Sequence, residues 1–114
     1  MLDEQGELKQ ELIKVYNQVN KELYNIGTRW VRVELAGRYI LIVASHRRLP
    51  SGRVLNGKMP VIARMFDILL LDEFKEKFKD ALTARFKFEI ECILKDYDPG
   101  SELAGTLIVL RNPV

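Results

Sequence analysis

The residues best suited to chemistry in this chain are the cations of one segment, His46–Phe66. The segment contains Arg47, Arg48, Arg53, Lys58 and Arg64. No aspartate or glutamate occurs between Glu34 and Asp67. Arginine offers a planar fork of donors to a carboxylate or phosphate, and glycines in the segment allow backbone N–H groups to approach an anion. These five residues therefore predict a site for an anionic ligand or for an acidic partner surface.

Two other interpretations of the same segment remain open. In the first, the segment is a solvated loop whose arginines pair with Asp67, Asp96 or Asp98. In the second, the basic loop and Trp30 bind a nucleic acid or nucleotide, with the indole stacking on bases. A net charge of only +2 disfavours this second interpretation. The segment also lacks the Gly-x-x-x-x-Gly-Lys-Ser/Thr pattern of a phosphate-binding loop, so no NTPase is predicted.

The remaining chemically capable residues are few. His46 is the only histidine, and with Asp96 or Asp98 it could form a small acid–base site; this is the weaker, enzymatic alternative. The two aspartates more simply shape a turn through side-chain bonds to the backbone. Cys92 is the only cysteine, which excludes a disulfide framework and leaves too few ligands for a structural zinc site. We expect no catalytic residue, no metal and no cofactor.

Length and composition predict one small globular domain. A chain of 114 residues with 47% hydrophobic and 30% charged residues can bury a core of its own. The polar start, MLDEQGELKQ, does not look like a signal peptide, and the apolar runs, such as residues 68–71, are far too short to span a membrane. We therefore expect a cytoplasmic protein without direct membrane insertion.

The elements that must position the basic segment follow from hydrophobic periodicity. Apolar residues recur every three or four positions over residues 7–25 and 60–86, which predicts two helices. Alternating or continuous apolar runs predict strands over residues 29–35, 38–45, 87–95 and 103–110. Residues 1–6 are expected to be a tail, and residues 47–59, with Pro50, Gly52 and Gly57, a basic loop.

These elements predict an α+β domain spanning residues 1–114. The order is αββαββ, and the simplest architecture is a four-stranded antiparallel sheet with both helices on one face. In the third strand Phe88, Ile90, Cys92 and Leu94 are expected to face the core. The uncovered face of the sheet then carries Trp30 and apolar residues of the second and fourth strands. Because exposed apolar patches usually mark interfaces, we expect a homodimer.

Three segments carry a resemblance to a known family. They are YNQVNKELYNIGTRWVRVEL (residues 16–35), DEFKEKFKDAL (72–82) and KDYDPGSELAGTLIVL (95–110). They resemble the MpsC-like domain family, a group of short bacterial domains of unknown function. The family is named for a proposed part of a sodium-translocating system that generates membrane potential. Many relatives have a Leu-Thr-Pro-Ala-Glu-like stretch after the second strand, where this chain has residues 48–53, RLPSGR.

The resemblance implies a small α+β domain and a soluble accessory role beside a membrane transport system. It brings no established catalytic residue. Combined with the basic segment, it predicts a non-enzymatic interaction module that binds an anionic ligand, or a partner protein in an ion-translocating complex, through Arg47, Arg48, Arg53, Lys58 and Arg64.

Overall fold

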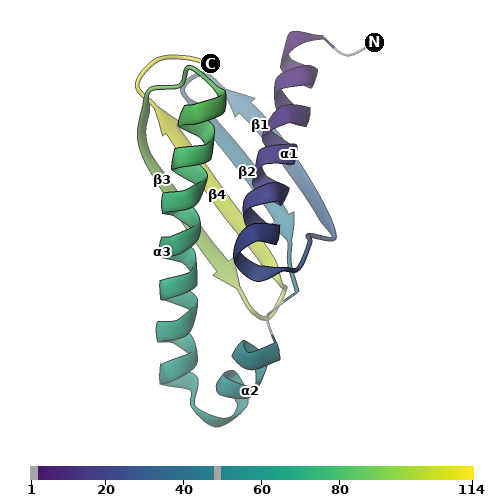
Figure 1. The fold of residues 1–114 in the computed structure, drawn as a ribbon, viewed down its shortest axis with the longest axis vertical. Coiled ribbons are helices and arrows are strands. Elements are labelled where there is room, and N and C mark those ends of the chain that lie inside the picture. Colours follow the sequence, from purple (N-terminus) through teal and green to yellow (C-terminus); the bar gives the residue numbers. More distant parts are fainter. Residues whose placement is uncertain (1–2, 48–49) are drawn as a thin grey trace.

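The fold is an antiparallel sheet covered on one face by two long helices, as the computed structural model shows (Figure 1). It describes residues 3–47 and 50–114. The elements are α1 (Glu4–Tyr24), β1 (Trp30–Ala36), β2 (Tyr39–Ser45), α2 (Pro50–Lys58), α3 (Pro60–Arg85), β3 (Ile90–Asp98) and β4 (Leu103–Leu110). The predicted α+β class and four-stranded antiparallel sheet are confirmed. The strand order, β1-β2-β4-β3, places the two long apolar strands in the centre of the sheet.

The helix ends follow local capping chemistry. Asp3 accepts a hydrogen bond from the backbone N–H of Gly6 at 2.7 Å and so caps α1 at its N-terminus. Asn25 ends the helix with a left-handed backbone, φ 55°. The predicted tail over residues 1–6 is therefore wrong for residues 4–6, which are helical; residues 1 and 2 lie outside the described part of the chain.

The core lies between the sheet and the two long helices. Its members are Leu12, Val15, Tyr16 and Val19 of α1, Phe74, Phe78 and Leu82 of α3, and the inward residues of the sheet, among them Ile40, Ile42 and Ile108. Burial of such side chains stabilises the fold by about 1.5–3 kcal/mol each. The core therefore holds the second half of α3 on the sheet.

The third strand departs from the predicted alternation. The register between β3 and β4 shifts between Ile90 and Cys92, so the strand contains a β-bulge there. Beyond the bulge, Ile93 and Lys95 point toward the helices, and Leu94 is 56% exposed on the other face. The expectation that Cys92 and Leu94 face the core is therefore wrong, because one extra residue reverses every later side chain.

The basic connection is mostly helical. The expected loop over residues 47–59 is wrong for Pro50–Lys58, which form α2. Proline suits the first turn of a helix. Gly52 and Gly57 each cost about 1 kcal/mol in a helix, and packing of α2 against α3 offsets this cost. Figure 1 shows α2 and the first turns of α3 extending beyond the end of the sheet. We call residues 50–69 the arm.

Candidate functional site

The arm carries an apolar stripe that the rest of the described chain leaves exposed. In its first half α3 buries Ala63 and Asp67, and not Ile62, Met65 and Leu69, which belong to the apolar periodicity of residues 60–86. Those three side chains are 43%, 60% and 68% exposed. Val54, Met59, Val61 and Ile68 are exposed beside them. Ile62, Met65 and Leu69 lie on one face of the helix, as the periodicity predicted. The first turns of α3 extend beyond the end of the sheet, so nothing in the described chain covers that face.

The predicted anion-binding residues do not converge on one point. Arg53 pairs with Glu102 at 3.4 Å, and Arg64 pairs with Asp96 at 3.9 Å. Lys58 is exposed at the end of α2, and Arg47 is exposed after β2. Arg48 lies outside the described residues. The interpretation in which arginines pair with acidic residues thus holds for Arg64 and Asp96, and the five cations are distributed along the arm and its root.

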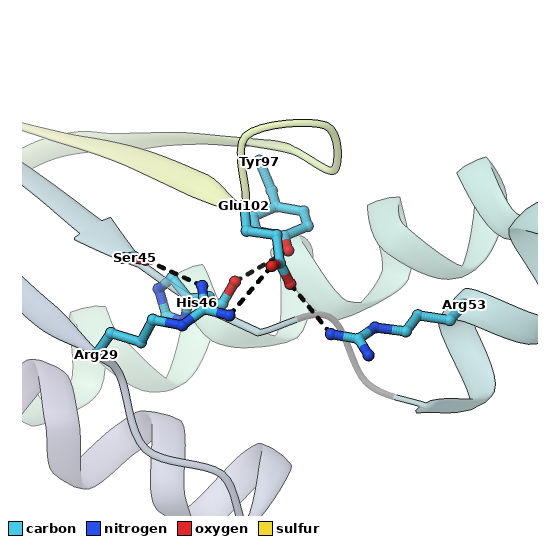
Figure 2. A network of polar contacts seen from close by, with 6 residues as sticks. All are labelled: Arg29, Ser45, His46, Arg53, Tyr97 and Glu102. Atoms are coloured by element: carbon cyan, nitrogen blue, oxygen red, sulfur yellow. Dashed lines mark hydrogen bonds and ion pairs between the residues drawn. The ribbon is translucent and has the colours of Figure 1, made fainter.

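Glu102 organises the root of the arm, as Figure 2 shows. Its carboxylate accepts from Arg29 at 3.2 Å and from Arg53 at 3.4 Å, and its backbone carbonyl accepts from the N–H of His46 at 2.9 Å. Its backbone is left-handed, φ 58°. One residue of the β3–β4 turn therefore ties together the start of β1, the end of β2 and α2. No sequence pattern indicates this role, because Arg29, His46 and Arg53 all lie far from Glu102 along the chain.

Beneath this network lies a polar cluster that the sequence also did not predict. The Tyr16 hydroxyl lies 2.6 Å from His46 Nε2 and accepts a hydrogen bond from Lys95 Nζ at 3.1 Å. The Lys95 amine lies 3.2 Å from the Phe74 ring centroid. Tyr97 donates its hydroxyl to the His46 carbonyl oxygen at 3.2 Å. The bulge in β3 creates the cluster, because it turns Lys95 toward the helices.

Burial controls the protonation of this cluster. Desolvation, and secondarily the nearby Lys95, lower the pKa of His46 to about 3. Desolvation also lowers the pKa of the Lys95 amine well below its usual value and raises the pKa of the Tyr16 hydroxyl. Both nitrogen bases thus favour their neutral forms, and Tyr16 stays protonated. His46 interacts with Tyr16 and Tyr97, and no bond joins it to Asp96 or Asp98 among the described residues.

The aspartates of the β3–β4 turn have structural contacts. Asp98 accepts from the backbone N–H of Ser101 at 3.0 Å and from its hydroxyl at 2.6 Å, and these bonds lower the pKa of Asp98. Asp96 accepts from the backbone N–H of Tyr97 at 2.8 Å. In the described part of the chain, no three of the His, Cys, Asp and Glu side chains are grouped so that they could hold a metal ion.

A cavity of about 70 Å³ opens beside the cluster, at the root of the arm. Its polar lining comes from His46, Arg47, Asp67 and Lys95, and its apolar lining from Tyr24, Ile26, Leu70, Leu71, Tyr97 and Ala104. The hydroxyl of Tyr24 donates to the carbonyl oxygen of Leu70 at 3.0 Å, which fixes the end of α1 against α3. The cavity is thus formed by segments from all parts of the chain.

Comparisons of the chain with protein-family models, with curated proteins and with solved structures each give no match. No helix in the described ranges has both the length and the apolar character needed to cross a bilayer. The case for a function therefore depends on the arm and on the cavity at its root.

Proposed function

We propose that the protein is a non-enzymatic interaction module that docks a partner protein on its arm. The observation that carries this proposal is the exposed stripe of Ile62, Met65 and Leu69 on the part of α3 that extends beyond the sheet. Side chains at such spacing form the usual contact face of a helix against another helix or a groove. An exposed apolar face of this kind costs free energy in water, and a partner surface removes that cost.

The charge of the arm specifies the partner's chemistry. Residues 50–66 contain three cations, Arg53, Lys58 and Arg64, and no acidic residue. All three are exposed: Lys58 ends α2, and the side chains of Arg53 and Arg64 are each 58% exposed despite their ion pairs. A partner with an apolar strip bordered by carboxylates complements this surface. Such charges mainly steer association and select the partner, while the apolar contacts supply most of the affinity.

The resemblance to the MpsC-like domain family supports a choice of partner. It implies an accessory role beside a membrane transport system, so the proposed partner is a cytoplasmic, acidic surface of an ion-translocating complex. A cytoplasmic location of this protein is part of the same proposal.

The proposal also includes a homodimer formed through the open face of the sheet. That face exposes Trp30, Tyr39, Leu41, Leu94 and Leu103. One row across it runs from Arg32 on β1, through Val43 and Gly105, to Asp96 on β3. A two-fold axis parallel to the strands would place Arg32 of each copy opposite Asp96 of the other, so the face is complementary to itself.

The docking proposal is tested by comparing two variants of the tagged protein expressed in its native cells. Leu69→Glu puts a charge on the stripe. Thr83→Glu puts the same charge at an exposed position in the second half of α3, outside the arm. Quantitative mass spectrometry of co-purifying proteins should show a set enriched with wild type and with Thr83→Glu, and lost with Leu69→Glu. Equal recovery with both variants would overturn the proposal.

The dimer is tested separately by sedimentation equilibrium. Wild type is expected to sediment as a dimer and Leu41→Lys as a monomer, because Leu41 lies in the centre of the open face. A monomeric wild type at concentrations well above those in cells would contradict this part of the proposal without affecting docking on the arm.

A further inference from the structure

Two basic side chains, Lys95 and Arg47, line the cavity at the root of the arm, and neither forms an ion pair within the described residues. Lys95 lines the cavity, and its amine contacts the Tyr16 hydroxyl and the rings of Tyr16 and Phe74. No carboxylate pairs with Lys95 within the described residues, and none pairs with Arg47. Buried charged groups in proteins are normally paired, because an unpaired one has lost its hydration without compensation. The Lys95 amine has only a hydroxyl and two ring faces as partners, so an anion that enters the cavity would stabilise its charged form as an ion pair.

The rest of the lining favours a ligand with an apolar body. Ile26, Leu70, Leu71 and Ala104 contribute aliphatic surface, and Tyr24 and Tyr97 contribute aromatic rings. The volume of about 70 Å³ is on the order of five times the space that one water molecule needs. That volume suits a molecule of a few carbon atoms and excludes a nucleotide or a peptide from the enclosed part.

We propose that this cavity binds a short-chain monocarboxylate, with its carboxylate between Lys95 and Arg47 and its carbon chain against Leu70 and Leu71. The proposal does not depend on docking at the arm. It moves the predicted anion site from the exposed arginines of the arm to Lys95 and Arg47, which line one open cavity. Arg47 is the one residue common to the predicted site and this one.

Binding at this site takes up a proton. Burial favours the neutral amine of Lys95 in the empty cavity, and an incoming carboxylate restores the positive form as its ion pair. The other titratable neighbours are His46 after β2, Tyr16 and Tyr24 on α1, Asp67 on α3 and Tyr97 on β3. His46 and the two tyrosines of α1 are held neutral by burial, and Asp67 has an interaction of its own. Carboxylate affinity should therefore fall as pH rises from 6 to 9, a range in which the carboxylate itself does not titrate.

The test is an NMR titration of the ¹⁵N-labelled protein with butyrate, with butyramide as the neutral ligand of the same shape. Butyrate should bind about tenfold more tightly than butyramide, the size expected for a charge-assisted hydrogen bond. The amide signals that shift should include those of Gly27, Leu71 and Ala104, which line the cavity. Raising the pH should weaken butyrate binding and leave butyramide binding unchanged.

Three variants make the titration decisive. Lys95→Met should bind butyrate no better than butyramide and should lose the pH dependence, while Lys79→Met, on the exposed face of α3, should behave as wild type. Arg47→Gln should weaken butyrate binding without a change in fold, since Arg47 is exposed. Equal affinity for acid and amide in wild type, or preference for the acid retained in Lys95→Met, would overturn the proposal. So would absence of butyrate binding.

Discussion

The burial of His46 predicts a measurable loss of stability on mild acidification. Its pKa falls from 6.5 to about 3 on folding, so the unfolded chain takes up the proton first as pH decreases. Between these two values the unfolded state binds more protons, and stability decreases as pH falls through 6.5. Each pH unit costs about 1.4 kcal/mol, so His46 alone should lower the free energy of unfolding by about 2 kcal/mol at pH 5.

The assay is urea unfolding of wild type and His46→Gln at pH 8 and pH 5. Because the chain has one histidine, the difference between the two proteins in their pH-dependent loss isolates this residue. Wild type should lose about 2 kcal/mol more than the variant over this interval. Lys95 contributes equally to both proteins and cancels. As an independent readout, the His46 ring signal in the NMR spectrum of the folded protein should not titrate between pH 8 and 5.

Equal losses in wild type and His46→Gln would refute the reasoning. So would a ring signal of the folded protein that titrates near pH 6.5, because His46 would then have access to water. Either result would mean that Tyr16 and Tyr97 do not enclose the imidazole as the contacts indicate.

Three further outcomes are expected. Glu102→Gln should cost about 1 kcal/mol, because it weakens the partly exposed ion pairs with Arg29 and Arg53, and should speed amide exchange in α2. Glu91→Gln, which weakens the exposed ion pair with Arg111, should cost less, and equal costs would argue against the role of Glu102 at the root of the arm. Phe78→Ala should cost about 3–5 kcal/mol in urea unfolding, because the ring is completely buried, and a loss below about 1 kcal/mol would contradict its place in the core. In wild type, the free energy of unfolding should increase between pH 7 and 10, because the pKa of Lys95 is lower in the folded than in the unfolded chain. Lys95→Met should raise stability at pH 7 and abolish this increase. An unchanged pH profile would show that the amine is hydrated.

The parts of the fold that were predictable follow from regular patterns. The strand Leu103–Leu110 has the predicted bounds, and α3 begins at the predicted Pro60 and ends one residue before the predicted end. Apolar periodicity predicts the bounds of such elements well, because their apolar residues recur at the spacing that places them on one face. In the C-terminal half of the chain α3 and β4 thus follow the prediction closely, whereas β3 lies three residues later than the predicted strand over residues 87–95.

The departures have a common physical cause, which is that they depend on tertiary contacts and not on the local sequence pattern. A single bulged residue in β3 turns Lys95 inward and Leu94 outward, and no local pattern announces a bulge. The helix α2 contains two glycines that favour a loop in isolation. Its formation depends on packing against α3.

The candidate site was predictable only in part. The concentration of positive charge at residues 47–64 was evident, and the structure shows that most of it belongs to an exposed helical arm. The Tyr16–His46–Lys95 cluster could not be inferred, because it joins α1, the end of β2 and β3 across the sheet. One signal did exist: Lys95 lies within a strand between Ile93 and Tyr97, the residues two positions away on the same face, which makes it a candidate for burial.

Site-specific photo-cross-linking in the native cells tests the central claim most directly. A photoreactive amino acid replaces Met65, on the exposed stripe of the arm. In a matched protein it replaces Thr83, an exposed residue in the second half of α3. We expect a discrete cross-linked product with a second protein from position 65 and no such product from position 83. The double variant Arg53→Glu, Arg64→Glu should lose the product. Absence of a product at position 65, or the same product at both positions, would contradict docking on the arm.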